Sequence, residues 1–362
     1  MKINLIAEIM GSNSGFAVHG RNLLKCLQGL GHEVSVECNL PKGWEAITDN
    51  ETRDAINNNY NSELNIMIGH PHFSQYALSD KPKGFIQFLV FEGDKIPAFW
   101  VPILNQDNIN QVWVASEDTK QAAITTGVKE EKIFIVSHGV DCEIFKPVEV
   151  EKTDNRFAFF ANKGWSKGID DRGGVAELLM AFNEEFGEDE PVKLLTKINS
   201  AYSFPGWDLQ EEINKLGIDK KKNSNINIIM DDITEGKLNE LYNQSDCFVN
   251  VSKGDAFGLG VSEALACGLP VLVTDKGGFL DFAKGNNVHY IKSELKPSPD
   301  LPTYEGINWN FPNKEDFKKK LREVYETYKG KDVDKIEIRN KIKGKFEWKN
   351  TSDKIKEALD KL

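Results

Sequence analysis

Short apolar runs and stretches with helical spacing follow one another along most of the chain. In the first half, Leu23, Leu24, Leu27 and Leu30 recur at helical spacing before Gly31 ends the helix. The apolar runs before and after this helix along the chain have the length and composition of strands. They are residues 2–8, 33–38, 64–69, 85–91, 110–116 and 132–136. We therefore expect a β-loop-α-β opening of the Rossmann-like kind.

The second half repeats this alternation after residues 148–156, a charged segment without apolar periodicity that is typical of an interdomain linker. Further strands are expected at 157–160, 192–196, 226–229, 247–251 and 271–274. With 362 residues, the chain is long enough for two domains with separate cores. We expect an α/β fold with a first domain at 1–150, a second at 151–345 and a C-terminal helix at 346–362. An apolar stripe at helical spacing predicts that helix: Phe346, Trp348, Ile355, Leu359 and Leu362.

A glycine-rich stretch in the second half indicates the most specific chemistry. The apolar strand at 247–251 leads into a loop with three glycines at 254–260, and a helix follows that ends before Pro270. Such a turn directs backbone N–H groups outward at the positive end of the helix dipole, which suits a phosphate. Two acids belong to this stretch, Asp255 in the loop and Glu263 about two helical turns later.

A glycine-rich turn alone also fits any βαβ unit, with the glycines serving close packing and Glu263 a solvated acid. The full string at 255–271 argues for more, because it resembles the E-x-F-G-x4-E-A-x-A-x-G-x-P-V signature of family 4 retaining glycosyltransferases. One residue departs from that signature. Asp255 stands where the family has Glu, so its carboxylate reaches one methylene less far.

Two other segments resemble the same family. Residues 15–34 resemble its opening, and residues 137–147 resemble the P-x-G-V-D-x3-F-x-P element that closes its first domain. The resemblance covers nearly the whole chain and implies the GT-B architecture. In that architecture two Rossmann-like domains face a cleft, and a C-terminal helix crosses back to the first domain. It also implies transfer of a sugar from a nucleotide diphosphate donor with retention of anomeric configuration.

The resemblance further implies which residues bind the donor. Glu263 would accept hydrogen bonds from the ribose hydroxyls, and Asp255 would hold hydroxyls of the donor sugar. The backbone N–H groups that follow Asp255, at Phe257, Gly258 and Leu259, would face the phosphates.

The same resemblance places cations around the leaving diphosphate, where they would neutralise developing charge. Arg172 and Lys167 are expected to do this, with Lys163 as an alternative to Lys167. Arg172-Gly173 stands where Arg-Lys is common, so that the usual lysine is missing. A solvated basic loop is the simpler interpretation of the same residues.

Four other positions are candidates by resemblance or by position. The loop from Gly11 to Gly15 would close over the phosphates, and Asp231 stands in the turn expected to contact the nucleotide base through the main chain. His70 follows a predicted strand and corresponds to a histidine that contacts the donor sugar in many relatives, although it is equally well explained as a loop residue. Glu92 follows a strongly apolar strand and is a candidate catalytic acid.

Charge and composition exclude some classes of function. The net charge is −11, so no global basic field for nucleic acid exists, and DNA is disfavoured as an acceptor. No apolar run reaches about 18 residues, so at most peripheral membrane contact is expected. The five cysteines show no paired spacing, which favours reduced thiols and a cytoplasmic protein. The only D-x-D, at 332–334, lies in a charged helical stretch and is interpreted as solvated surface, and no metal or other cofactor is expected.

The sequence thus predicts a retaining glycosyltransferase that moves a sugar from a UDP- or GDP-sugar to a glycan, lipid-linked or protein acceptor. The alternative is a catalytically silent nucleotide-sugar-binding partner of another transferase, which the replacements at Asp255 and Gly173 favour. A nicotinamide-dependent enzyme fits less well, because the loop after the first strand lacks G-x-G-x-x-G.

Overall fold

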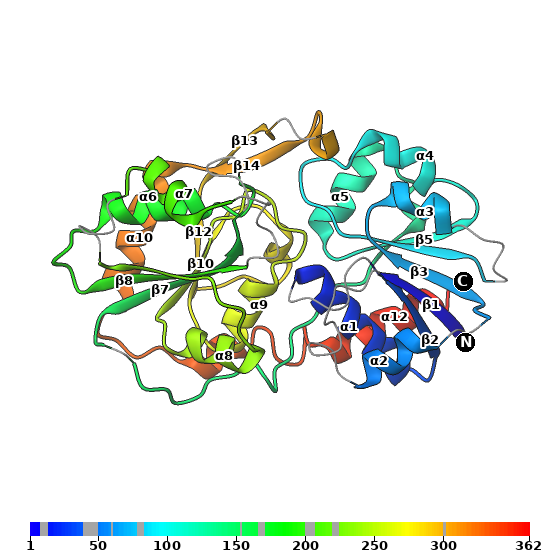
Figure 1. Ribbon diagram of the computed structural model, residues 1–362, viewed down its shortest axis with the longest axis horizontal. Coiled ribbons are helices and arrows are strands. Elements are labelled where there is room, and N and C mark those ends of the chain that lie inside the picture. Colours follow the sequence, from blue (N-terminus) through cyan, green and yellow to red (C-terminus); the bar gives the residue numbers. More distant parts are fainter. Residues whose placement is uncertain are drawn as a thin grey trace. The chain divides into compact units, whose positions relative to one another are not determined.

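The computed structural model describes most of the chain as two compact units (Figure 1). The described residues are 1–7, 14–38, 50–58, 61–77, 83–152, 154–165, 171–199, 207–218, 224–299 and 302–362. The first unit comprises Met1–Gly139, Asp300–Asn308 and Phe346–Leu362, and the second comprises Val140–Pro299 and Trp309–Lys345.

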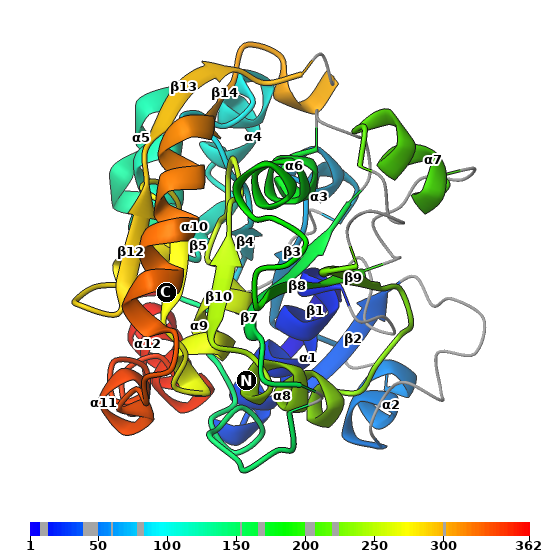
Figure 2. The ribbon, with the colours of Figure 1, turned by 90° about the vertical axis from the view of Figure 1, so that its left-hand side faces the viewer.

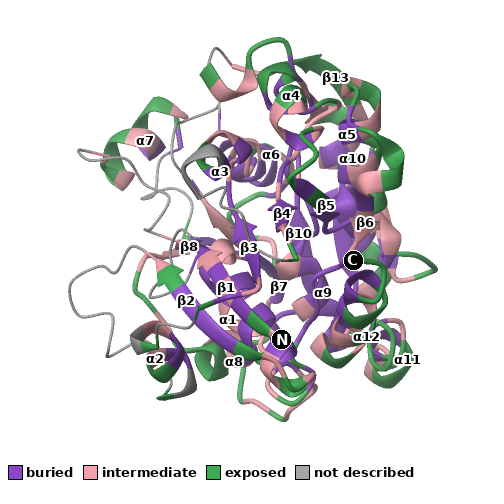
Figure 3. Cartoon of the chain, turned by 90° about the vertical axis from the view of Figure 1, so that its right-hand side faces the viewer, coloured by how far each residue is buried: buried purple, intermediate pink, exposed green. Residues whose placement is uncertain are grey.

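A six-stranded parallel sheet forms the centre of the first unit, in the order β2-β1-β3-β4-β5-β6. Its strands are β1 (Lys2–Ala7), β2 (Glu33–Cys38), β3 (Leu64–Ile68), β4 (Phe85–Leu89), β5 (Ile109–Val114) and β6 (Ile133–Ile135). Every residue of β3 and β4 is buried, as Figure 3 shows in purple. Burial on both faces explains why four of the five residues in each strand are apolar, with Asn65 and Gln87 as the exceptions.

Helices flank this sheet and begin at recognisable caps. The hydroxyl of Ser14 accepts a hydrogen bond from the N–H of Ala17 at the start of α1, and Ser116 does the same for Thr119 at the start of α5. The helices of the unit are α1 (Gly15–Gly29), α2 (Asn50–Asn57), α3 (Pro71–Ala77), α4 (Val101–Leu104), α5 (Glu117–Thr126) and α12 (Trp348–Leu359). Short 3-10 turns are η2 (Ala98–Trp100), η3 (Glu130–Lys132) and η7 (Pro302–Tyr304).

The C-terminal helix α12 packs on the first unit, as its apolar stripe predicts. The Cys26 thiol of α1 donates to the carbonyl oxygen of Trp348 at 3.3 Å, and the Gln111 amide of β5 donates to that of Ala358 at 2.7 Å. Ile355 is fully buried in this contact. Leu362 departs from the prediction: it lies beyond the end of the helix and is exposed.

The second unit is built around another six-stranded parallel sheet, in the order β12-β11-β10-β7-β8-β9. Its strands are β7 (Phe157–Gly164), β8 (Val192–Asn199), β9 (Ile226–Ile229), β10 (Cys247–Asn250), β11 (Val271–Thr274) and β12 (Val288–Ile291). Figure 2 views this sheet with α6, α8 and α10 around it. The helices are α6 (Val175–Glu185), α7 (Leu209–Lys215), α8 (Glu235–Asn243), α9 (Leu259–Ala266), α10 (Lys314–Tyr328) and α11 (Lys335–Arg339), with one 3-10 turn, η6 (Gly278–Asp281).

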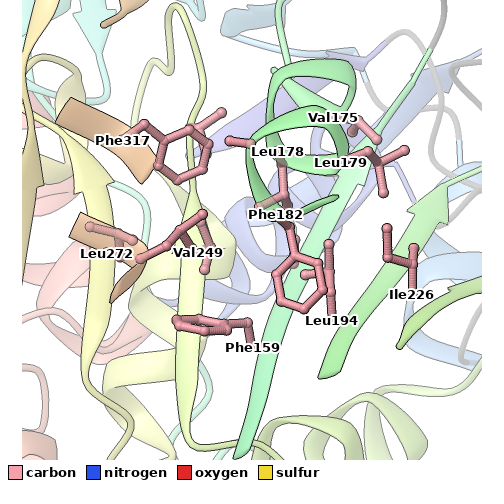
Figure 4. Close-up of a cluster of buried hydrophobic side chains, with 14 of the residues drawn as sticks. Phe159, Val175, Leu178, Leu179, Phe182, Leu194, Ile226, Val249, Leu272 and Phe317 are labelled. Atoms are coloured by element: carbon pink, nitrogen blue, oxygen red, sulfur yellow. The ribbon is translucent and has the colours of Figure 1, made fainter. Parts of the chain in front are cut away.

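The core of the second unit lies between its sheet and α6. Figure 4 shows Leu178 and Phe182 of α6 directed toward Phe159 and Leu194 on the neighbouring strands β7 and β8. All four side chains are at most 2% exposed. This packing fixes the carboxyl end of β7, where the candidate site begins.

The segment after Gly139 belongs to the second unit, although we expected the first domain to continue to residue 150. Its backbone is bound by side chains of α8. Asn239 accepts from the N–H of Lys146 at 3.1 Å, and Asn243 accepts from that of Val148 at 3.0 Å. Arg339 is buried and donates to the carbonyl oxygens of residues 142, 145 and 266. Because side chains bind this stretch, it shows no apolar periodicity in the sequence.

A two-stranded hairpin of β13 (Ser293–Pro297) and β14 (Asn308–Pro312) follows β12. Its tip belongs to the first unit, which the sequence did not predict. Ile307 is 3% exposed and packs in the core of that unit. The backbone N–H and the amide of Asn308 both donate to the Asp94 carboxylate, at 2.7 and 2.8 Å.

Candidate active site

Strand β10, a glycine-rich loop, helix α9 and strand β11 follow one another as the sequence predicted. Gly258 begins α9 with a backbone φ of +92°, which side-chain-bearing residues rarely adopt. A Cβ at this position would lie 2.8 Å from the Cβ of Phe279, so there is no room for one. The N–H groups of Leu259 and Gly260 precede the first hydrogen bond of α9, which runs from Val261 to the Gly258 carbonyl oxygen at 3.0 Å, so they have no acceptor inside the helix. Phe257 is buried against the ring of Phe282, with centroids 5.0 Å apart.

Hydrogen bonds fix the loop on both sides of Asp255. The hydroxyl of Ser252 donates to the carbonyl oxygen of Gly254 at 2.6 Å, and the hydroxyl of Thr274 donates to that of Ser252 at 3.0 Å. The N–H of Gly278 donates to the Asp255 carbonyl oxygen at 2.7 Å. The loop is therefore preorganised by its own backbone and by the end of β11.

The Asp255 carboxylate forms an ion pair with Lys163. The Lys163 ammonium lies 2.7 Å from Oδ2 of Asp255, and the amide of Asn250 donates to the same oxygen at 3.3 Å. Burial alone would raise the pKa of Asp255. The charges of Lys163 and Arg172 outweigh it, so the pKa stays below its usual value and the carboxylate is charged.

Arg172 supplies a second cation close to the loop. Its guanidinium donates to the carbonyl oxygen of Gly254 at 2.6 Å, and its own carbonyl oxygen accepts from the N–H of Lys253 at 2.9 Å. These contacts join the segment after β7 to the segment after β10. Two cations and one acid thus meet at the carboxyl edge of the sheet, where ligands bind in open α/β folds.

Lys253 lies beneath the loop, and sequence reasoning missed it. Its side chain is fully buried. Its ammonium lies 2.6 Å from Oε1 of Glu177 on α6, donates to the Asp171 carbonyl oxygen at 2.7 Å and stands 4.9 Å from the Phe311 ring centroid. Burial raises the pKa of Glu177, and the Lys253 charge opposes that rise. Lys253 therefore holds together three segments that support the loop.

Glu263 lies in α9 and is bound by Tyr242 of α8. The Tyr242 hydroxyl donates to Oε2 of Glu263 at 2.7 Å. Burial raises the pKa of Glu263 to about 7, although the hydrogen bond from Tyr242 lowers it and the charge of Glu235 adds to the rise. An acid of this kind accepts hydrogen bonds from ligand hydroxyls when charged and can also hold a proton near neutral pH.

Asp231 stands after β9 and is exposed. Burial lowers the pKa of the neighbouring Lys197 on β8, and the charges of Asp232 and Asp231 oppose this effect. The Lys197 ammonium donates to the carbonyl oxygen of Ile198 at 2.7 Å. Asp231 thus lies at the same sheet edge as the loop around Asp255.

Other predicted residues lie in the first unit. Gly15 is the first residue of α1, and His70 follows β3 with its ring centroid 5.3 Å from that of Trp100. Glu92 follows β4 and accepts a hydrogen bond from the Tyr304 hydroxyl at 2.7 Å. Two further predicted residues lie outside the described residues: Gly11 and Lys167.

The structure therefore brings together Asp255, Arg172 and Lys163, the alternative cation that the sequence left open. Charged side chains and a helix N-terminus at one sheet edge suit an anion such as a diphosphate. In the described part of the chain, no three His, Cys, Asp or Glu side chains converge as metal ligands. The described helices include none that is long and apolar enough to cross a membrane.

Residues 206–341 match the family model of glycosyl transferases group 1. The chain is also 24% identical over 305 residues to putative glycosyltransferase 45 of Sulfolobus islandicus filamentous virus (isolate Iceland/Hveragerdi). That alignment covers 82% of this chain and 75% of the viral protein.

Solved structures with a similar fold span the whole chain. A glycosyltransferase from Rickettsia africae ESF-5 has a TM-score of 0.70 at 18% identity, with 99% of this chain and 98% of that chain covered. HepE of Anabaena in complex with UDP-glucose has a TM-score of 0.67 at 14% identity, and the lipopolysaccharide outer core galactosyltransferase WaaB has 0.67 at 16%; both comparisons cover 100% of each chain. These likenesses confirm the predicted α/β fold of the GT-B type.

Proposed function

Since this chain is a glycosyltransferase of the group 1 type, we propose that it transfers a sugar from a UDP-sugar to a glycan-type acceptor with retention of anomeric configuration. The observation that carries the proposal is the meeting of Lys163, Arg172 and Asp255 at the start of α9. The HepE structures that contain UDP and UDP-glucose support uridine as the base. Retention follows the resemblance of the 255–271 string to family 4 enzymes.

In this proposal the diphosphate of the donor lies against the N–H groups at Gly258 and Leu259. Lys163 and Arg172 neutralise the charge that develops as the bond to the sugar breaks, which is the largest contribution such a site makes. Both cations are already held in place, Lys163 by Asp255 and Arg172 by the Gly254 carbonyl oxygen. Little reorganisation is then needed during the reaction.

Glu263 binds the ribose of the donor in this proposal. Its carboxylate accepts hydrogen bonds from ribose hydroxyls, while Tyr242 holds it from the opposite helix. Asp255 binds hydroxyls of the transferred sugar. No metal takes part, because the two cations serve the diphosphate. The free cysteines, four of them buried, favour a reducing, cytoplasmic environment, and the net charge of −11 disfavours nucleic acid as the acceptor.

The test is thermal unfolding together with donor hydrolysis over a panel of UDP-, GDP- and ADP-sugars. A donor at about 100 times its Kd should stabilise the protein by roughly 2.7 kcal/mol. We expect one UDP-sugar to raise the Tm and to release free sugar slowly. If no nucleotide sugar raises the Tm, the proposed donor site is wrong.

A catalytically silent nucleotide-sugar-binding protein is the second candidate, and one observation favours it. Gly173 stands where a lysine is common in the family that the sequence resembles, and a Cβ there would lie 2.7 Å from the carbonyl oxygen of Gly164. This backbone therefore leaves no room for that side chain. A UDP-sugar that raises the Tm without any release or transfer of sugar would support the silent protein over the enzyme.

A further inference from the structure

An aromatic cluster at the carboxyl edge of the first sheet leaves two phenylalanine rings in solvent. Phe73 is 43% exposed and Phe99 is 54% exposed. The ring of His72 lies close to both, with centroid distances of 4.1 Å to Phe73 and 6.0 Å to Phe99. Phe73 and His72 belong to α3, which follows β3, and Phe99 belongs to η2, which follows β4. We call Phe73, Phe99 and His72 the acceptor cluster.

The acceptor cluster rests on a rigid base. Trp100 is fully buried in the core of the unit, and its ring lies 5.9 Å from that of Phe99. The turn before α3 is fixed from below by Gln87, whose buried amide donates to the carbonyl oxygen of Gly69 at 2.9 Å. The exposed rings are therefore held by the sheet, and a ligand would not have to order a loose loop.

One hydrogen bond determines which nitrogen of His72 carries the proton. The indole N–H of Trp100 points to Nδ1 of His72 at 3.2 Å, and an indole nitrogen can only donate. Nδ1 of His72 is therefore the acceptor, and the neutral ring carries its proton on Nε2. The acceptor cluster thus combines two apolar faces with one hydrogen-bond donor.

The charges near the acceptor cluster favour a neutral ligand. Residues 64–77 and 96–104, which include the whole cluster, contain no charged side chain. The residues between them, 78–95, carry three acids and three lysines, so their charges balance, and only Glu92, Asp94 and Lys95 follow β4. An anionic membrane surface or a nucleic acid backbone would require several basic residues.

We propose that the acceptor cluster is a subsite for a neutral sugar ring of the acceptor. The rings of Phe73 and Phe99 cover the C–H faces of the sugar, and Nε2–H of His72 donates to one of its hydroxyls. The carboxyl edge of a parallel sheet is where open α/β folds place their ligands. This inference rests on the proposed function, because it names the class of acceptor for the same transfer.

The first test is an NMR titration with neutral saccharides, using protein that carries isotope-labelled histidine. The probes are glucose, galactose, maltose and lactose. We expect the resonances of His72 to shift with at least one probe, and the apparent Kd to rise at least tenfold in Phe73→Ala and Phe99→Ala. Ile336→Ala is the matched control, because Ile336 is an exposed apolar residue (60%) of the second unit. It should leave the titration unchanged.

The second test separates this inference from the proposed function. Thermal stabilisation by the UDP-sugar and its hydrolysis without acceptor should be the same in Phe99→Ala as in the parent chain, while the acceptor KM for the best saccharide rises at least tenfold. Intact donor binding with no His72 response to any probe overturns the subsite alone. Binding to phosphatidylcholine vesicles is measured as well. If the parent chain binds them and Phe99→Ala does not, the exposed rings contact a membrane and the sugar subsite is overturned.

Discussion

The hydroxyl of Tyr242 donates a 2.7 Å hydrogen bond to Oε2 of Glu263, across two helices of the second unit. Burial raises the pKa of Glu263 to about 7, and this hydrogen bond restrains the rise. At neutral pH the acid is therefore divided between its charged and neutral forms. Small changes around it alter the charge that it presents to a ligand.

Replacing Glu263 with Gln should weaken donor binding. A hydrogen bond to a charged group contributes about 1.5–3 kcal/mol, so Kd for the UDP-sugar should rise roughly 10- to 100-fold. Calorimetric titration measures this directly. Glu240→Gln on the exposed face of α8 is the control and should bind the donor normally. An unchanged Kd for Glu263→Gln would show that this acid does not contact the donor.

The same substitution should change how stability depends on pH. The pKa of Glu263 is about 7 in the folded protein, above its ordinary value of 4.5. Its contribution to stability is therefore complete below about pH 4.5 and is lost as the pH rises through 7. Glu263→Gln cannot lose a proton, so its Tm relative to the parent should increase from pH 5 to pH 8. Thermal unfolding at four pH values checks this, and a constant difference would contradict the raised pKa.

Lys163 should contribute to turnover more than to folding. Lys163→Met removes the cation that we place at the leaving diphosphate and leaves Asp255 with Arg172 as its remaining cation. Donor hydrolysis should fall about 100-fold, the usual loss when one such group is removed. Lys163→Arg, which keeps the charge, should retain more of the rate. If Lys163→Met hydrolyses the donor as fast as the parent chain does, Lys163 has no part in the mechanism.

Gly258→Ala should both destabilise the protein and impair the site. Its φ of +92° and the 2.8 Å approach to Phe279 impose strain of about 1–3 kcal/mol on any side chain. Gly236→Ala is the matched control, because a Cβ there would meet only the hydroxyl of Thr234, at 3.9 Å. It lies in α8 and should stabilise by up to about 1 kcal/mol. Urea unfolding gives the free energy of unfolding of both variants. A loss in Gly258→Ala alone shows that the requirement for glycine is specific to position 258.

The buried pair of Lys253 and Glu177 can be measured by a double-mutant cycle. Lys253→Met leaves Glu177 buried without its cation and should cost about 3–5 kcal/mol. Adding Glu177→Gln removes the stranded charge and should recover part of that loss. The free energy of unfolding of the two single variants and the double variant gives the coupling. Additive losses would show that the ammonium and the carboxylate do not interact.

Sequence patterns predicted the first sheet's six strands and five of the second sheet's six, because a parallel sheet is buried on both faces. Strand β4 illustrates this, since all five of its residues are buried and four of them are apolar. Strand β12 was missed, since its two middle residues are only partly buried or exposed and the run is not continuously apolar. The boundary between the units was predicted at residue 150, whereas the first segment of the first unit ends at Gly139. The stretch around Lys146 and Val148 is held by amide side chains of α8, and such contacts leave no periodicity to detect.

The candidate site was predicted in part. Asp255, Glu263 and Gly258 were found because the glycine pattern around them is specific. Lys253 was missed because a lysine in a loop is almost always exposed, and only the tertiary structure places an acid beside it. Tyr242 reads as an apolar position of a helix, and nothing in its neighbourhood indicates that its hydroxyl reaches an acid on α9.

The return of α12 to the first unit has a consequence for synthesis on the ribosome. The second unit is complete once residue 345 has emerged, whereas the first unit lacks its last helix until residues 346–362 have emerged as well. Until then the surface of α1 around Cys26, which α12 covers, faces solvent. The unit that is translated first is therefore finished last, and a nascent chain stalled before residue 346 would expose an apolar surface to chaperones.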